Sequence, residues 1–197
     1  MTPTSRTALI GKSFDRADDY DAAAVIQRLS ARDLARAIAS RLAEAWPGHG
    51  AGHAPARILE IGCGTGLLTG QLRARWPQAE IVATDYSPRM IARARARLAE
   101  GGPQSGMLAF HVMDAGQPDV AGPFDVICGN MVLQWLENPA EVLPKLAGLL
   151  APGGVLGVST LLEGTFAQWR AACAAEGGQA ATPLYPDAKA VAAWAPY

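Results

Sequence analysis

The chain has 197 residues, half of them hydrophobic, and a formal net charge of −1. This composition argues against general disorder and against broad electrostatic binding to nucleic acid. The three cysteines, Cys63, Cys128 and Cys173, form no CxxC pair, so neither a zinc ribbon nor a disulfide framework is expected. We find no apolar run of membrane length and no signal peptide, which suits a cytoplasmic protein.

Predicted helices and strands alternate along the chain. A long helix is expected from about Tyr20 to Trp46, where apolar residues recur near the helical period at Val25, Leu29, Leu34, Ile38 and Leu42. The expected strands are 57–61, 80–85, 107–114, 124–132 and 155–162. The expected helices among them are 66–76, 87–100, 138–150 and 165–177. Ser87 is expected to cap its helix, and Pro152-Gly153-Gly154 to stop the helix 138–150. The alternation predicts an α/β fold with a mostly parallel sheet flanked by helices.

Three glycines stand where the first strand ends and a helix begins, at Gly62, Gly64 and Gly66. Without a Cβ atom, such residues let the backbone approach a ligand closely. The dinucleotide pattern GxGxxG would place the third glycine one residue later, which disfavours a nicotinamide dehydrogenase. Glu60, just upstream, would repel a pyrophosphate but favour a cationic ligand.

Polar residues follow three further predicted strands. Asp85 ends the second strand about twenty residues after the glycines, where an acid can accept hydrogen bonds from both ribose hydroxyls. Asp114 ends the third strand, with Ala115 beside it, and "GNMVLQW" ends the fourth. These segments are all expected at the carboxyl ends of strands, where open α/β sheets bind ligands.

Together these motifs resemble the class I S-adenosylmethionine-dependent methyltransferases over residues 57–162. The resemblance implies a Rossmann-like fold with S-adenosyl-L-methionine bound by Glu60, Gly62, Cys63, Gly64, Gly66, Asp85, Tyr86, Asp114, Ala115, Asn130 and Met131. In this reading the glycines surround the methionine part and Glu60 acts on its ammonium group. Asp85 would hold the ribose, Asp114 and Ala115 the adenine, and the pair 130–131 the amino-acid end.

A narrower resemblance runs almost end to end. The segments 13–34, 130–139 and 159–172 are similar to the malonyl-acyl-carrier-protein O-methyltransferases of biotin synthesis. This resemblance implies methylation of the free carboxylate of a malonyl group on acyl-carrier protein or coenzyme A. Two positions depart from the family pattern, Ala23 in place of a histidine and Ala151 in place of a basic residue. The alternatives are a methyltransferase for a free small acid or another metabolite, and a non-catalytic cofactor-binding partner protein.

The resemblance divides the chain into an N-terminal helical lid, residues 1–50, and a methyltransferase domain, residues 51–197. Tyr20 is expected to act from the lid on the acceptor carboxylate or the methyl group, and Gln134 and Trp135 to shape the acceptor pocket. A carboxylate acceptor is already ionised at pH 7, so neither a general base nor a metal is required. Related enzymes add two C-terminal strands that this sequence does not supply, so we expect strand 155–162 to be an open apolar edge.

Two other groups of residues carry weaker expectations. His49 and His53 are four residues apart in a glycine-rich loop, which lacks the helix that would align them on a metal. The arginines of helix 88–100 could meet an acidic carrier protein or nucleic acid, but a solvated helix face is favoured. The sequence does not predict the oligomeric state.

Overall fold

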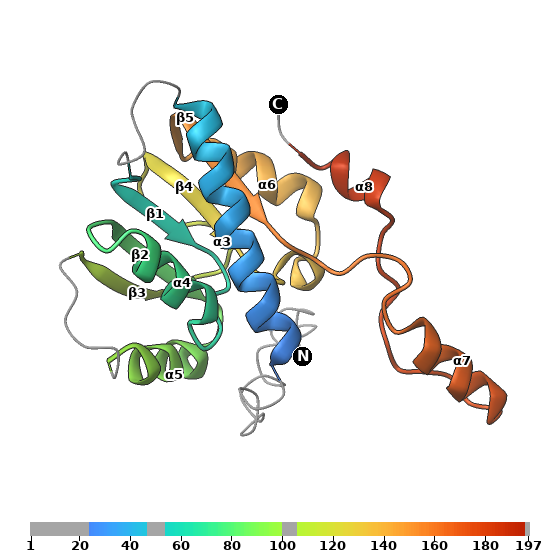
Figure 1. The fold of residues 1–197 in the computed structure, drawn as a ribbon. Helices are drawn as coiled ribbons and strands as arrows, with labels where there is room; N and C mark the ends of the chain where they lie inside the picture. Colours follow the sequence, from blue (N-terminus) through green and yellow to red (C-terminus); the bar gives the residue numbers. More distant parts are fainter. Residues whose placement is uncertain (1–23, 47–53, 100–105, 196–197) are drawn as a thin grey trace, which may run out of the picture.

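Five parallel strands form the centre of the molecule in the order β3-β2-β1-β4-β5 (Figure 1). The computed structural model describes residues 24–46, 54–99 and 106–195. Its strands are β1 Arg57–Glu60, β2 Glu80–Asp85, β3 Leu108–Val112, β4 Phe124–Gly129 and β5 Leu150–Val158. The predicted α/β class and parallel sheet are confirmed.

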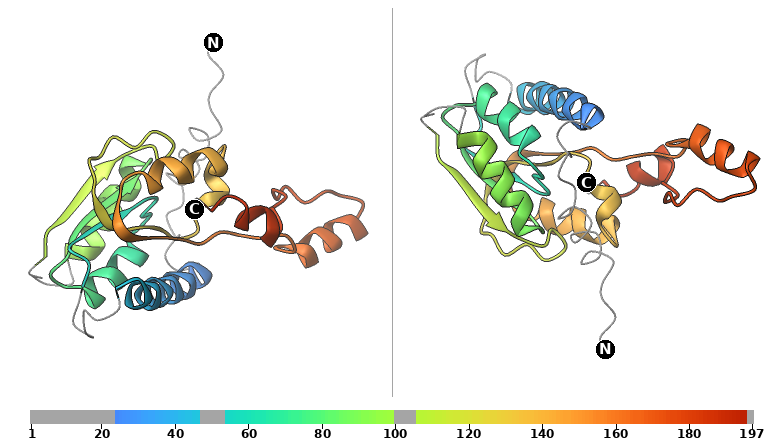
Figure 2. Two further views of the ribbon diagram at one scale, coloured as in Figure 1. Left: turned by 90° about the horizontal axis from the view of Figure 1, so that it is seen from above. Right: turned by 90° about the horizontal axis from the view of Figure 1, so that it is seen from below.

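Helices cover both faces of this sheet (Figure 2). They are α3 Val25–Ala45, α4 Leu67–Arg75, α5 Pro88–Ala99, the 3₁₀ turn η1 Leu133–Trp135, α6 Pro139–Ala147, α7 Ala167–Ala175 and α8 Ala188–Ala192. Helices α3, α4 and α5 pack in one apolar cluster, and α6 packs in another. Successive strand residues alternate between the two clusters, so Ile58 belongs to the first and Leu59 to the second. None of the described helices combines the length and apolar character needed to cross a membrane.

Helix α3 belongs to the core of the sheet domain. Its buried residues, which include Leu34 and Ile38, recur at helical spacing and join the cluster of α4 and α5. A Cβ atom at Gly157 of β5 would lie 2.6 Å from Cγ1 of Ile38, so the missing side chain lets the helix approach the strand. The predicted start of this helix at Tyr20 and the predicted boundary at residues 50 and 51 lie outside the described residues.

Strand β5 differs from the prediction. Helix α6 ends at Ala147 without reaching residue 150, and β5 already begins at Leu150, so Pro152-Gly153-Gly154 lies inside the strand. The pairing with β4 shifts from Phe124↔Leu150 to Val126↔Val155, which marks an irregularity around the proline. Such an irregularity accommodates a residue that has no N–H to donate to the ladder. The strand ends at Val158, so residues 159–162, predicted as its last part, lie outside it, and Leu161 lines the cavity described below.

The C-terminal arm, residues 159–195, follows β5, and its helix α7 stands away from the sheet (Figures 1 and 2). Within the described part of this arm there are helices α7 and α8 but no strand, and neither helix has a buried residue. Trp194 packs back against the cluster around α6. Among the described strands, β5 is therefore an edge of the sheet, as the sequence predicted.

Candidate functional site

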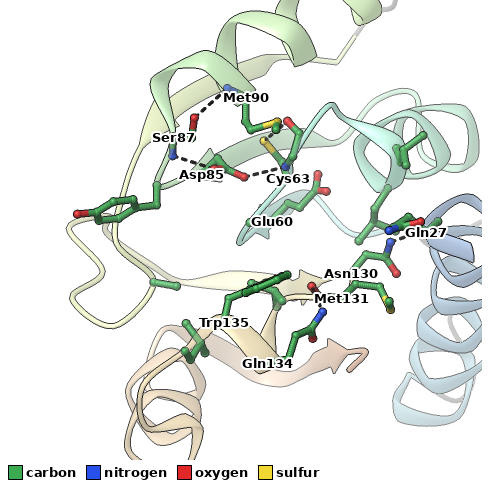
Figure 3. A pocket seen from close by; sticks show the side chains of 18 of the residues that line it. Gln27, Glu60, Cys63, Asp85, Ser87, Met90, Asn130, Met131, Gln134 and Trp135 are labelled. Atoms are coloured by element: carbon green, nitrogen blue, oxygen red, sulfur yellow. Dashed lines mark hydrogen bonds between the residues drawn. The ribbon is translucent and has the colours of Figure 1, made fainter. Parts of the chain in front are cut away.

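A cavity of about 770 Å³ lies at the carboxyl ends of β1, β2, β3 and β4 (Figure 3). Helix α3 and the C-terminal arm complete its walls. The predicted residues that line it are Glu60, Gly62, Cys63, Gly64, Asp85, Tyr86, Asp114, Ala115, Asn130, Met131, Gln134 and Trp135. Gly66 lies at the start of α4, facing Leu98, and does not line the cavity. Tyr20 lies outside the described residues.

The glycine loop shapes the floor of the cavity. Gly62 and Gly64 both have positive φ angles, 61° and 54°, which residues with a Cβ atom rarely adopt. A Cβ atom at Gly62 would lie 2.6 Å from Cγ2 of Val132, so this glycine lets the loop after β4 pack against the loop after β1. A Cβ atom at Gly64 would meet no atom within 4 Å. The backbone at Gly64 is therefore open to a ligand.

Asp85 is held in place by two backbone groups. Gly64 N donates to its Oδ2 and Ser87 N to its Oδ1, each at 2.8 Å. Because a carboxylate has about four lone-pair positions, it can still accept hydrogen bonds from a ligand. Ser87 in turn caps α5, as predicted, because its Oγ accepts from Met90 N at 3.2 Å. The same turn thus starts the helix and orients the acid.

Glu60 is the most buried acid of the site, with 1% of its surface exposed. Burial raises the pKa of its carboxyl and the nearby charge of Asp85 adds to this, so that the pKa is about 8. Thr69 Oγ1 donates to Glu60 Oε2 at 2.6 Å, and this hydrogen bond opposes the increase in pKa. A cation bound beside this carboxyl would favour its ionised form.

Asp114 and Ala115 follow β3 and also line the cavity. Gly116 N donates to Asp114 Oδ1 at 2.8 Å, which fixes the carboxylate in a tight turn. Ala115 is buried and belongs to the cluster around α6. Among the described residues that line the cavity, every ionised side chain is acidic and none is lysine, arginine or histidine. The lining therefore favours a positively charged ligand.

The amides after β4 are engaged within the protein. Asn130 Nδ2 donates to Gln27 O at 3.0 Å. Gln134 Nε2 donates to Met131 O at 2.7 Å, while Gln134 Oε1 accepts from Thr160 Oγ1 at 3.1 Å. Gln134 is thus fixed at both ends, which suits the predicted shaping role.

Sequence reasoning did not single out several residues of the lining. Ile26 and Gln27 enter it from α3, and Phe166 and Tyr185 from the C-terminal arm. Nothing in their local sequence distinguishes them from ordinary helix or loop residues, because only the tertiary fold brings them to the cavity. His49 and His53 lie outside the described residues, and within those residues no cluster of three metal-binding side chains occurs.

Comparison with known proteins identifies the family of this site. Residues 59–156 match the family described as "Methyltransferase domain". This range contains the carboxyl ends of β1 to β4 and all of β5 except its last two residues. The chain belongs to the class I S-adenosylmethionine-dependent methyltransferases. This assignment agrees with the glycine loop and the acids at successive strand ends.

Curated relatives include methyltransferases for two kinds of acid. The malonyl-[acyl-carrier protein] O-methyltransferase of Magnetococcus marinus is 35% identical over 93% of this chain and 63% of its own length. The trans-aconitate 2-methyltransferase of Methylobacterium radiotolerans is 44% identical, over 61% of this chain and 45% of its own length. The chain therefore spans less than two thirds of the length of these relatives.

Solved methyltransferases share the fold. CalS10, an amino pentose methyltransferase of Micromonospora echinaspora, was solved with S-adenosylmethionine bound. It has a TM-score of 0.54 and 28% identity, covering 69% of this chain and 53% of CalS10. NodS, an N-methyltransferase of Bradyrhizobium japonicum solved with S-adenosyl-L-homocysteine, has a TM-score of 0.56 and 25% identity, covering 84% of this chain and 78% of NodS. The cofactor of the methyltransferase family is S-adenosylmethionine.

Proposed function

We propose that this chain is an O-methyltransferase that methylates the free carboxylate of a malonyl thioester, carried on acyl-carrier protein, in the early biotin pathway. One observation carries the choice of acceptor. The similarity to the malonyl-[acyl-carrier protein] O-methyltransferase extends over 93% of the chain. The aligned region therefore includes most of α3 and most of the C-terminal arm. These two segments supply a part of the cavity wall that does not come from the strand ends.

The residues present fit the cofactor of the family. The open backbone at Gly64 leaves room for a closely bound ligand, and the acidic lining suits its positive charge. In this proposal Gly62, Cys63 and Gly64 surround the methionine part, and Glu60 stabilises its ammonium group. The other predicted contacts are Asp85 and Tyr86 at the ribose, Asp114 and Ala115 at the adenine, and Asn130 and Met131 at the amino-acid end. Bound there, S-adenosylmethionine supplies an electrophilic methyl group on a sulfonium sulfur.

The protein's own contribution is binding, alignment and the exclusion of water. The acceptor carboxylate is ionised at pH 7, so no residue has to remove a proton. Apolar side chains of α3 and the arm, including Ile26, Leu161 and Phe166, line the cavity and would shield the reacting groups from water once both substrates are bound. The acids of the lining repel an anionic acceptor until a cation occupies the pocket, which favours binding of the cofactor first.

The direct test is transfer of a radiolabelled methyl group by the purified chain. Malonyl-acyl-carrier protein, malonyl-coenzyme A, malonate and trans-aconitate are compared at equal concentration, with Asp85→Ala as the impaired control. We expect the malonyl thioesters to be methylated at least tenfold faster than the free acids. Faster methylation of trans-aconitate would contradict the proposed acceptor, and cofactor binding without transfer to any acceptor would contradict an enzymatic role.

A methyltransferase for a free small acid is the second candidate. It is favoured by the 44% identity to a trans-aconitate 2-methyltransferase, although this covers a smaller share of the chain. The role of Tyr20 remains a prediction for either acceptor. Tyr20→Phe should lower kcat and leave the Kd of the cofactor nearly unchanged. An unchanged kcat would remove Tyr20 from the mechanism.

A further inference from the structure

Ser159 is the first residue after β5, and its hydroxyl bonds to three groups, two in the turn after β4 and one in α3. It donates to Asn130 Oδ1 at 2.9 Å. It accepts from Met131 N at 2.9 Å and from Ser30 Oγ of α3 at 3.1 Å. A hydroxyl has one hydrogen to donate and two lone pairs to accept, so all its capacity is used.

Two of these partners form the turn after β4. Met131 has a φ angle of 56°, a left-handed conformation that is unfavourable for a residue with a side chain. Its N–H is held by Ser159 Oγ, and its carbonyl oxygen accepts from Gln134 Nε2. The backbone of Ser159 adds to this support, since Ser159 N donates to Gly129 O and Val132 N donates to Ser159 O. The turn that lines the cavity is therefore fixed from the end of β5.

The third partner connects the turn to α3. Ser30 lies one helical turn after Gln27, whose carbonyl oxygen accepts from Asn130 Nδ2 (Figure 3). Asn130 is thereby held at both ends of its amide, by Ser159 and by Gln27. Because Gln27 also lines the cavity, these bonds set the distance between the α3 wall and the turn after β4.

We propose that Ser159 is a positioning residue for the cofactor pocket. This inference rests on the cofactor binding of the proposed function and not on its acceptor. Ser159 does not line the cavity, so it acts through Asn130 and Met131 rather than by touching a ligand. One hydroxyl fixes the orientation of the Asn130 amide, holds Met131 in its left-handed turn and ties both to α3.

The test compares Ser159→Ala with Ser159→Thr, which keeps the hydroxyl, and Ser30→Ala, which removes only the link to α3. The Kd of S-adenosyl-L-homocysteine is measured by calorimetry, at a temperature where circular dichroism shows each variant folded. We expect Ser159→Ala to raise this Kd about tenfold, as for the loss of a buried hydrogen-bond partner. Ser159→Thr should stay within about threefold of the wild type, and Ser30→Ala should fall between the two. If Ser159→Ala does not fold, Ser159→Cys replaces it, because a thiol has similar size but is a weak donor.

The outcomes separate this inference from the proposed function. A melting temperature lowered in Ser159→Ala with an unchanged Kd would show a merely structural serine and overturn the positioning role. A raised Kd that Ser159→Thr restores would support it, as would a raised KM for the cofactor with an unchanged KM for the acceptor. If the wild-type chain does not bind S-adenosyl-L-homocysteine, both the proposed function and this inference are overturned, whereas failure to methylate malonyl thioesters leaves the inference intact.

Discussion

The two sides of the cavity are built in different ways. On the strand side, the carboxyls of Asp85 and Asp114 accept hydrogen bonds from backbone N–H groups, and Glu60 is buried beneath a threonine hydroxyl. On the other side, the C-terminal arm contributes Phe166 and Tyr185 from a segment whose helices bury no residue. A rigid sheet therefore presents the proposed cofactor site, and a sparsely packed arm presents the proposed acceptor wall. Substitutions on the two sides should separate cofactor binding from acceptor choice.

The largest effect is expected on the strand side at Gly62. Gly62→Ala adds a Cβ atom 2.6 Å from Cγ2 of Val132 and places a side chain at a positive φ angle. Overpacking costs about 1–3 kcal/mol and the left-handed backbone about 1–2 kcal/mol, so the free energy of unfolding should fall markedly. Denaturant unfolding measures this change, and cofactor binding should be lost with it.

Gly64→Ala is the matched control, because it has the same backbone strain but no clash. Its free energy of unfolding should fall by only about 1–2 kcal/mol, while the added methyl group enters the space proposed for the cofactor. Equal destabilisation of the two variants would contradict the packing that we assign to Gly62.

A smaller effect is expected for Asp85→Ala. The variant removes a carboxylate that accepts from Gly64 N and Ser87 N and that we propose binds the ribose. Cofactor binding should weaken by about 1–3 kcal/mol, as measured by calorimetry. Asp119→Ala, at an exposed acid that contacts His111 away from the cavity, should bind normally. Full-strength binding by Asp85→Ala would refute the ribose contact.

The raised pKa of Glu60 predicts that the stability of the folded protein depends on pH. Its pKa is raised to about 8 in the folded protein, against about 4.3 in an unfolded chain, so the folded state keeps a proton that the unfolded state releases between these values. The contribution of Glu60 to the free energy of unfolding of the cofactor-free protein should therefore be greatest at or below about pH 4 and should decrease as the pH rises toward about 8. Thermal melts at several pH values measure this decrease. The variant Glu60→Gln, whose amide cannot titrate, should not show it.

The same carboxyl predicts proton release on cofactor binding. A cation beside Glu60 favours its ionised form, so affinity should rise with pH up to about 8 and then level off. Calorimetry in two buffers of different ionisation enthalpy measures the released proton. A wild-type chain that releases no more protons than Glu60→Gln would show that the cofactor does not act on this carboxyl.

The smallest effect is expected on the arm. Phe166→Ala removes an aromatic ring that lines the cavity and lies 6.5 Å from the ring of Tyr185, centroid to centroid. The KM of the acceptor should rise by a factor of about 2–12, the equivalent of one aromatic contact, with the cofactor Kd unchanged. Trp169→Ala, on the same arm but exposed and outside the lining, should change neither constant. A changed cofactor Kd in Phe166→Ala would contradict the assignment of cofactor binding to the strand side and acceptor binding to the arm.

The sequence predicted the strand side well and the rest poorly, for physical reasons. Asp85, Asp114 and the glycines follow strands that the alternation of helices and strands predicts to be parallel, so these residues are expected at the same edge of the sheet. The network of Ser159 could not, because Ser30 and Ser159 are 129 residues apart and meet only after α3 packs on β5. The sequence predicts the start of β5 at residue 155 because Pro152-Gly153-Gly154 indicates a stop, whereas the strand begins at Leu150 and accommodates the proline at an irregularity.

The position of β4 beside β1 matters while the chain is being synthesised. Strand β1 can pair with β2 soon after both leave the ribosome, but β4 follows later, since Arg57 and its partner Asp125 are 68 residues apart. Until then the apolar edge of β1, which includes Ile58 and Leu59, is open to other chains. The nascent protein should accordingly depend most on chaperones between the emergence of β1 and that of β4.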